Sequence, residues 1–209
     1  MKLGLIGYGK MNKLVEKFSS DTIVEITRDY IKDFSADLYI DFSNAALVEQ
    51  NGVALAERGK RHVIGTTGWK SNKLRAAVER HGSAALYSPN FSLDVARFFL
   101  LLEEAKKLFG LPTKGSEQHH KSKADAPSGT AKKIEELYGI RFDALRTDEV
   151  CFKHTVEWET ISITHAAKNR DGYAKGALAA AHWLADKRGW YTLDDMLRSL
   201  HTADHAFSR

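Results

Sequence analysis

The densest group of reactive side chains lies between residues 117 and 131, which have the sequence EQHHKSKADAPSGTA. Two adjacent histidines, His119 and His120, are followed by Lys123. Histidine exchanges a proton near neutral pH, and a lysine ammonium donates a proton or holds an anion. Adjacent residues of an extended segment point in opposite directions, so we expect only one histidine to face a ligand unless the backbone turns.

The same segment ends where we expect a helix to begin. Ser128, Gly129 and Thr130 follow a proline, and the start of a helix offers free backbone amides at its positive end. With the histidines and the lysine, these groups would form a receptor for a compact anion beside a proton donor. Taken singly, each feature is also explained by a solvated charge or a helix cap.

A metal site is the main alternative explanation of the paired histidines. Such a site needs further cysteine, aspartate or glutamate ligands at suitable spacing, and the sequence shows none. Cys151 is the only cysteine of the chain, so a cysteine cluster and an intrachain disulfide are excluded. We therefore predict no metal.

A second candidate site is a glycine turn near the start of the chain. Residues 3–6 form a short apolar run, and apolar residues recur at helical spacing from Met11 to Phe18. A glycine turn between a strand and a helix brings the backbone close to the pyrophosphate of a dinucleotide. Asn12 occupies the position where the usual fingerprint has glycine or alanine. The expected cofactor contacts here are Gly7, Tyr8, Gly9, Lys10, Met11 and Asn12.

The end of the next predicted strand normally selects the nucleotide. An acidic residue there binds the ribose hydroxyl of NADH, and an arginine favours the 2′-phosphate of NADPH. Arg28 and Asp29 lie side by side at this point, and a solvated surface pair explains them equally well. The sequence leaves the choice between NADH and NADPH open.

Two further loops follow predicted strands, at residues 65–68 (GTTG) and 88–91 (SPNF). Ligands bind beyond the carboxyl ends of the strands in an open parallel sheet. We expect Thr67 to contact both cofactor and substrate. The expected cofactor contacts in these loops are Gly65, Thr66, Thr67, Ser88, Pro89, Asn90 and Phe91.

The elements that must position these groups change in kind along the chain. Up to residue 89, short apolar runs alternate with helical patterns, and this predicts an α/β domain with a parallel sheet covered on both faces. Helices at 93–109 and 130–138, strands at 149–157 and 160–165, and a small-residue helix at 176–185 then predict an α+β domain with a mixed sheet. We place the first domain at 1–90 and 183–209, and the second at 91–182.

Composition excludes several classes of protein. The chain has 209 residues, a formal net charge of +4 and 43% hydrophobic residues. Its basic residues form no run that is typical of a nucleic-acid groove, so nucleic acid is not an expected partner. Since we find neither a signal peptide nor a membrane span, we expect a cytoplasmic protein.

The pattern His-His-x-x-Lys-x-Asp-Ala-Pro-Ser-Gly-Thr-Ala at 119–131 resembles the signature of the dihydrodipicolinate reductase family, also called 4-hydroxy-tetrahydrodipicolinate reductases. The resemblance extends over nearly the whole chain in the same order. Its other segments are 7–12, 41–43, 65–68, 89–92 and 165–178.

This resemblance implies a Rossmann-like dinucleotide-binding domain completed by the C-terminal residues, a mixed-sheet substrate and oligomerisation domain, and a homotetramer. It implies hydride transfer from NADH or NADPH to an unsaturated cyclic dicarboxylate of the diaminopimelate route to lysine. By the family's pattern, His119 and Lys123 are proton donors and catalytic residues. The implied substrate contacts are His120, Ser128, Gly129, Thr130 and Thr67.

The chain also departs from the family's pattern. It is shorter than typical members, Asp94 and Ala96 replace residues common in the family, and residues 146–150 are compressed. Two alternatives therefore stay open. A catalytically silent dinucleotide sensor would keep residues 7–12 but could lose His119 and Lys123. Another imine oxidoreductase, such as a diaminopimelate dehydrogenase, would not need residues 125–130.

Overall fold

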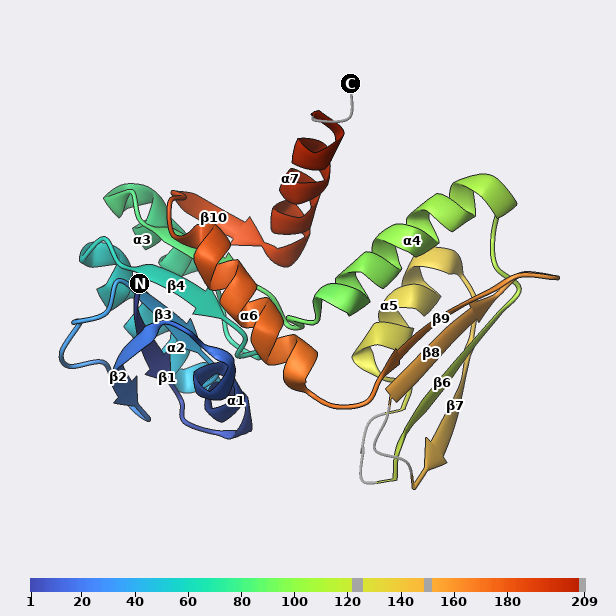
Figure 1. Cartoon of the computed structure of the whole chain (residues 1–209), viewed down its shortest axis with the longest axis horizontal. Helices are drawn as coiled ribbons and strands as arrows, with labels where there is room; N and C mark the ends of the chain where they lie inside the picture. Colours follow the sequence, from blue (N-terminus) through green and yellow to red (C-terminus); the bar gives the residue numbers. More distant parts are fainter. Residues whose placement is uncertain (122–125, 149–151, 207–209) are drawn as a thin grey trace. The chain divides into compact units, whose positions relative to one another are not determined.

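The computed structural model describes residues 1–121, 126–148 and 152–206. The chain divides into two compact units, Met1–Ala96 with Asp171–Arg209, and Arg97–Arg170. Each unit has its own sheet, as Figure 1 shows. This α/β organisation, with a parallel sheet followed by a mixed sheet, is the one expected from the sequence.

The sheet of the first unit has, among the described residues, six strands in the order β10-β5-β4-β3-β1-β2. Every neighbouring pair is parallel. The C-terminal strand β10 pairs with β5 and so completes the sheet, as the family resemblance implied. The strands are β1 (Lys2–Ile6), β2 (Thr22–Thr27), β3 (Leu38–Asp41), β4 (Arg61–Ile64), β5 (Ala84–Tyr87) and β10 (Gly189–Thr192).

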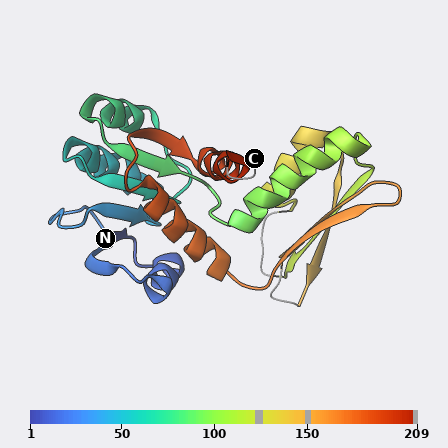
Figure 2. The ribbon, with the colours of Figure 1, turned by 45° about the horizontal axis from the view of Figure 1, so that its top comes forward.

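Helices cover both faces of this sheet, as the alternating pattern predicted (Figure 2). The helices α2 and α3 pack together over one face, and α6 contacts β3, β4 and β5 and lies beside α1. Asn44 caps α2 as expected, because its side chain accepts a hydrogen bond from the backbone amide of Ala46 at 3.0 Å. The helices are α1 (Lys10–Phe18), α2 (Ala45–Glu57), α3 (Asn72–His81), α6 (Asp171–Leu184) and α7 (Leu193–Ala206).

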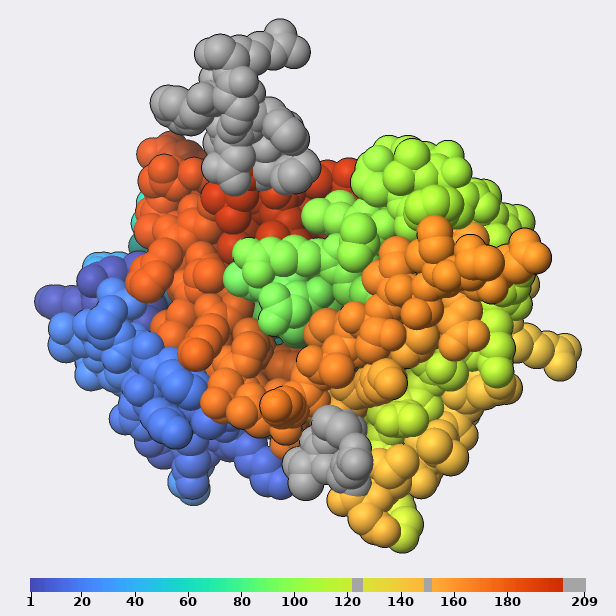
Figure 3. Space-filling view, turned by 45° about the vertical axis from the view of Figure 1, so that its right-hand side comes forward, coloured from blue at the N-terminus to red at the C-terminus, as the bar shows by residue number. Residues whose placement is uncertain are grey.

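Helix α6 packs very closely on the first unit because most of its buried residues are alanine or glycine. A Cβ atom on Gly176 would lie 1.8 Å from the backbone oxygen of Phe91, so only glycine fits there. In the space-filling view of Figure 3, the orange surface of α6 adjoins the blue surface of the N-terminal residues. All of α6 therefore belongs to the first unit, whereas the boundary expected from the sequence, at residue 183, lay near the end of this helix.

The second unit contains a mixed sheet in the order β7-β6-β8-β9 within the described residues. Strands β6 and β7 are parallel, and the other neighbouring pairs are antiparallel. Two helices pack on one face around a core that includes Leu102, Ile134, Phe142 and Val156. The elements are α4 (Leu93–Phe109), β6 (Lys114–His120), α5 (Gly129–Tyr138), β7 (Phe142–Thr147), β8 (Phe152–Glu157) and β9 (Ser162–Ala167).

The structure adds strands that the sequence patterns did not predict. Strand β7 was not expected, because its burial is irregular and Phe142 is its only buried residue. The strand expected at 149–157 is described from residue 152, and α6 begins at Asp171 instead of residue 176.

In the part of the chain that is described, no helix combines the length and the apolar character that crossing a membrane requires.

Candidate active site

The glycine turn lies between β1 and α1, where the strand order reverses. Gly7 has a φ of 78°, and a Cβ atom there would lie 2.5 Å from the backbone oxygen of Phe42. A Cβ atom on Gly9 would meet nothing within 4 Å. Helix α1 begins without a side-chain cap and without an acidic residue in its first turn. The backbone amides at the start of α1 have no side-chain cap, and the space beside Gly9 is open. Together they form a cradle suited to a phosphate.

The Asn12 side chain is hydrogen-bonded to the backbone of this turn. It is fully buried, and its amide nitrogen lies 2.8 Å from the carbonyl oxygen of Ile6, 2.5 Å from that of Gly7 and 3.3 Å from that of Ile40. An amide with two hydrogens in this position ties the end of β1 to β3. Where the usual fingerprint has a small residue that allows close packing, Asn12 instead makes hydrogen bonds.

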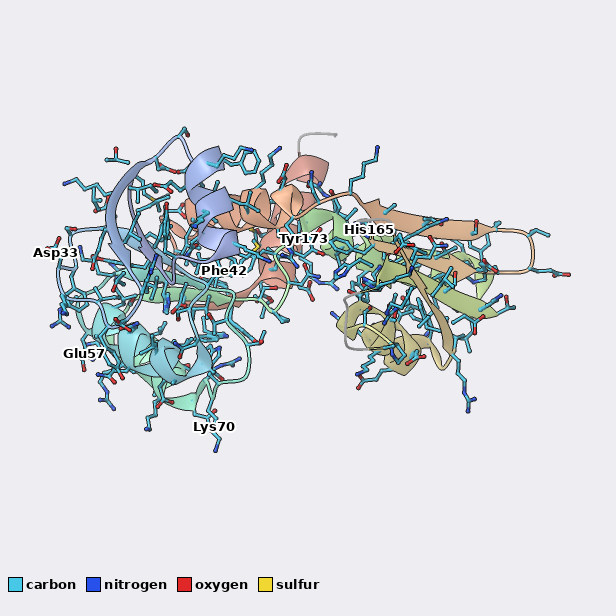
Figure 4. All side chains as sticks on the ribbon, turned by 90° about the horizontal axis from the view of Figure 1, so that it is seen from below. Asp33, Phe42, Glu57, Lys70, His165 and Tyr173 are labelled. Carbon is cyan, nitrogen blue, oxygen red and sulfur yellow. The ribbon has the colours of Figure 1, made fainter. Side chains whose placement is uncertain are left out.

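The loops that follow β3, β4 and β5 pack around Phe42 (labelled in Figure 4). A Cβ atom on Gly65 would lie 2.1 Å from the Phe42 ring, so this glycine makes room for the aromatic side chain. The rings of Phe42 and Phe91 meet edge to face at 5.9 Å. The three loops, which come from distant parts of the sequence, therefore form one packed rim.

A buried carboxylate, Asp41, also joins these loops. It accepts hydrogen bonds from the backbone amide and hydroxyl of Ser43, at 2.9 and 2.6 Å, and from the Thr66 hydroxyl at 3.1 Å. The His62 ring nitrogen Nε2 lies 3.3 Å from it. Burial raises the pKa of Asp41, but the hydrogen bonds and the charge of His62 outweigh burial and lower it below its usual value. Asp41 thus stays ionised as a fixed acceptor.

The loop after β5, at residues 88–92, is stabilised by hydrogen bonds between its own residues. Ser88 donates to the backbone oxygen of Asn90 at 2.6 Å, and the Asn90 side chain accepts from the Ser92 amide at 2.8 Å. Ser88 is buried, while Pro89 and the distant Thr67 are exposed. The backbone of this loop is therefore preformed, and its exposed residues are available to a ligand.

The segment after β2, where the sequence predicts nucleotide selection, is anchored by Asn51 of α2. The Asn51 side chain accepts from the backbone amide of Ile31 at 3.1 Å and donates to the backbone oxygen of Asp29 at 3.2 Å. Arg28 and Asp29 are both exposed. Asn51 thus anchors the backbone that carries these two exposed side chains.

These features fit a bound dinucleotide. The open cradle at Gly9, the uncapped start of α1 and the rim loops lie beyond the carboxyl ends of parallel strands, where such cofactors bind. The predicted residues at 7–12, 65–67 and 88–91 all lie at this end of the sheet.

The second candidate site lies on the mixed sheet. Along β6, buried and partly exposed residues alternate, so Glu117 and His119 share the face that carries the helices. His120 points to the opposite face, as expected for adjacent residues of a strand. His119 is 5% exposed, and its ring lies 5.8 Å from that of Phe152 and 5.2 Å from that of His154.

Ser128 connects this strand to the start of α5. Its hydroxyl caps the helix by accepting from the Ala131 amide at 3.2 Å, and it lies 3.1 Å from the Nε2 atom of His154. Its backbone amide donates to both oxygens of Glu117, at 3.0 and 3.2 Å. Gly129 is exposed and Thr130 is partly exposed at the positive end of the helix.

Glu117 is the electrostatic centre of the cluster. Its Oε2 atom lies 3.2 Å from Nε2 of His119 and 3.5 Å from Nε2 of His154, and its Oε1 atom lies 3.7 Å from the Arg146 guanidinium. Burial raises the pKa of Glu117, but the hydrogen bonds from His154 and Ser128 and the charge of His119 lower it to about 2. The carboxylate is therefore ionised and acts only as an acceptor.

Ligand atoms of Glu117, His119 and His154 all lie within 4.8 Å of one another. The sequence did not reveal this set, because His154 comes from another strand. The distances would suit a small divalent ion, but the carboxylate already accepts from the Ser128 amide and faces the Arg146 cation. We interpret the set as a hydrogen-bond network, because a second positive charge at this carboxylate would be repelled by the guanidinium.

The structure brings together some of the residues expected in the substrate site. His119, Ser128, Gly129 and Thr130 lie on the helix side of the mixed sheet, whereas His120 does not. Lys123 lies outside the described residues. Thr67 belongs to the first unit.

Sequence reasoning missed Glu117, Arg146 and His154 as members of the cluster. The spacing of Glu117 from His119 could have indicated the first, since residues two apart share one face of a strand. His165 (labelled in Figure 4) extends the cluster, because its ring stacks on that of His154 with centroids 6.5 Å apart. No local pattern marks Arg146, His154 or His165 as neighbours.

The parallel sheet with its glycine cradle defines a Rossmann-like dinucleotide-binding protein with a second, mixed-sheet unit. Family models described as dihydrodipicolinate reductase, N-terminus, and dihydrodipicolinate reductase, C-terminus, match residues 9–91 and 95–197. The chain belongs to the dihydrodipicolinate reductase family.

Individual relatives agree with this assignment. A 4-hydroxy-tetrahydrodipicolinate reductase from Christiangramia forsetii is 34% identical, over 96% of this chain and 99% of the relative. One from Archaeoglobus fulgidus is 36% identical, over 71% of this chain and 70% of the relative. The fold is similar to that of dipicolinate-bound dihydrodipicolinate reductase from Paenisporosarcina sp. TG-14, with a TM-score of 0.79, 17% identity, and coverage of 93% of this chain and 98% of that one.

Proposed function

We propose that this protein reduces 4-hydroxy-tetrahydrodipicolinate to tetrahydrodipicolinate, with NADH or NADPH as the reductant, in the diaminopimelate route to lysine. The observation that carries the proposal is the placement of His119 beside the start of α5, where Glu117 contacts both His119 and Ser128. A proton donor next to a helix N-terminus suits a dicarboxylate that gains a hydride and a proton and loses its 4-hydroxyl group as water.

In this proposal the dicarboxylate binds at the start of α5. The amides of Gly129 and Thr130 and the Thr130 hydroxyl would hold one carboxylate, with Thr67 as a further contact. His120, which lies on the opposite face of the mixed sheet, is left out of this arrangement. His119 would supply a proton and Lys123 a second one. These roles follow the family's pattern, and the partial positive charge of the helix N-terminus supports the carboxylate contacts.

The dinucleotide would bind at the carboxyl end of the parallel sheet. Residues 7–12 would hold the pyrophosphate, Arg28 would approach the ribose, and residues 65–67 and 88–91 would complete the site. When bound, the reduced nicotinamide supplies the hydride. Asp41 and Phe42 would keep the rim loops in place, because each contacts more than one of them, and Asn12 would hold the glycine turn against β3.

We also propose self-association into a homotetramer. Helices α4 and α5 pack on one face of the mixed sheet, and the opposite face carries Ser116, Gln118 and His120 of β6. That face would pair with a second copy of the chain. Light scattering coupled to size exclusion measures the assembly, and a monomeric mass at micromolar concentration would contradict it.

The test of the reaction is a paired kinetic assay with NADH and NADPH and freshly generated substrate. We expect turnover with at least one nucleotide. Lys123→Ala is expected to lose turnover and keep dinucleotide binding. A sensor would show no turnover in the unmodified protein, and a diaminopimelate dehydrogenase would oxidise diaminopimelate instead; either result would refute the proposal.

A further inference from the structure

The family pattern assigns roles to His119, His120 and Lys123, but it leaves Glu117 without one. Glu117 is 1% exposed, and its carboxylate contacts His119, His154 and the Ser128 amide. An ionised carboxylate buried without partners would be strongly destabilising. The contacts of Glu117 are therefore what stabilises its charge at this buried position. Two of them, with His119 and with the Ser128 amide, indicate its role.

The first contact sets the proton of His119. Glu117 is ionised and can only accept a hydrogen bond, so the His119 Nε2 atom, 3.2 Å away, must carry the hydrogen. The imidazole is thereby held as the Nε2–H tautomer, and Nδ1 becomes the nitrogen that gains and loses the exchangeable proton. Carboxylate partners are known to fix the tautomer and raise the basicity of histidine in this way.

The second contact sets the start of α5. The Ser128 amide donates to both Glu117 oxygens, at 3.0 and 3.2 Å. This amide is one of the four at a helix start that have no partner within the helix. By binding it, Glu117 fixes the orientation of the turn that carries Gly129 and Thr130.

We propose that Glu117 is a positioning residue that acts through both contacts, so that one side chain holds the proton donor in its reactive tautomer and aims the substrate-carboxylate turn. This inference rests on the proposed function. His154 supports the arrangement from β8, where its Nε2 atom lies 3.1 Å from the Ser128 hydroxyl and 3.5 Å from Glu117.

The test uses Glu117→Gln, which keeps the shape of the side chain and removes its charge. Without the carboxylate, the imidazolium form of His119 is less stable. The decline of kcat with rising pH should therefore move to lower pH, by about 1 unit or more. The KM for the dicarboxylate should rise, because the α5 turn loses its anchor, while the Kd of the dinucleotide stays unchanged.

The matched control is Glu135→Gln. Glu135 also accepts a backbone amide hydrogen bond in the second unit, from Phe142 at 2.8 Å, and its partner there is not a histidine. It should lose stability without moving the pH profile. Glu117→Asp keeps the charge, and we expect it to restore much of the wild-type profile. If Glu117→Gln leaves both the profile and the KM unchanged, the inference is overturned.

A second measurement does not depend on turnover. Nitrogen-15 NMR of the histidine rings in the unmodified protein identifies the tautomer of His119, assigned with His119→Gln. The Nε2–H tautomer supports the inference, and the Nδ1–H tautomer overturns it, even if Glu117→Gln fails to fold. Absence of turnover in the unmodified protein would instead count against the proposed function, so the two failures are distinguishable.

Discussion

The side-chain amide of Asn12 donates to the backbone oxygen of Ile6 at 2.8 Å, across the turn that joins β1 to α1. Asn12 is the first buried residue of α1, and its amide also approaches the carbonyl oxygen of Ile40 on β3. The glycine turn is therefore held by a polar contact to two strands. In the usual fingerprint, a small residue at this position serves only close packing.

Asn12→Ala should destabilise the protein and weaken dinucleotide binding. The Gly7 carbonyl would lose the Asn12 donor, and an unsatisfied buried group costs about 1–3 kcal/mol. The Ile6 carbonyl would keep the backbone amide of Phe42 at 2.9 Å. Urea unfolding and fluorescence titration with NADPH measure the two effects. Asn72→Ala makes the same chemical change at an exposed position of α3 and should alter neither quantity. Equal behaviour of the two variants would show that the Asn12 amide is unimportant.

Two glycines of the same helix should respond in opposite ways to alanine. In Gly176→Ala the new Cβ would lie 1.8 Å from the Phe91 backbone oxygen, so α6 must shift and the free energy of unfolding should fall by about 1–3 kcal/mol. In Gly172→Ala the new Cβ meets nothing within 4 Å, and stability should rise by about 0.5–1 kcal/mol. Thermal unfolding compares the pair, and a destabilised Gly172→Ala would contradict this view of α6.

The stability contributed by Glu117 should depend on pH. Its pKa in the folded protein is lowered to about 2, from 4.5 when unperturbed. A lowered pKa means that this stabilisation is complete above about pH 4.5 and is lost as the pH falls towards about 2. Between these values the difference in unfolding free energy between wild type and Glu117→Gln should shrink by up to about 1.4 kcal/mol per pH unit. Urea unfolding at a series of pH values measures it, and a constant difference would refute the prediction.

Asn51→Ala should change how the protein discriminates between nucleotides. The variant leaves the Ile31 amide and the Asp29 carbonyl without the Asn51 side chain, so the segment that carries Arg28 loses its anchor. We expect weaker binding of both NADH and NADPH and an altered ratio of their Kd values, measured by fluorescence titration. Gln50→Ala, at the neighbouring position of α2, is the control. Unchanged Kd values in Asn51→Ala would exclude this role.

Local patterns explain why much of the fold was predictable. The apolar run before Gly7, the helical spacing from Met11 to Phe18 and the cap at Asn44 each involve residues a few positions apart. Such signals depend on backbone geometry and on side-chain periodicity, which neighbouring residues set by themselves. Strand β7 lacked such a signal because its exposed residues do not alternate with buried ones.

The sequence by itself determined the family motif, the glycine turn, the alternation of strands and helices, and the opposite directions of His119 and His120. Only the tertiary structure decided what surrounds them. The contacts of Glu117 with Ser128 and His154 span 11 and 37 residues of chain, counted from their positions. Strand pairing and helix packing bring these residues together, and both depend on burial across the whole unit, which no short stretch of sequence encodes.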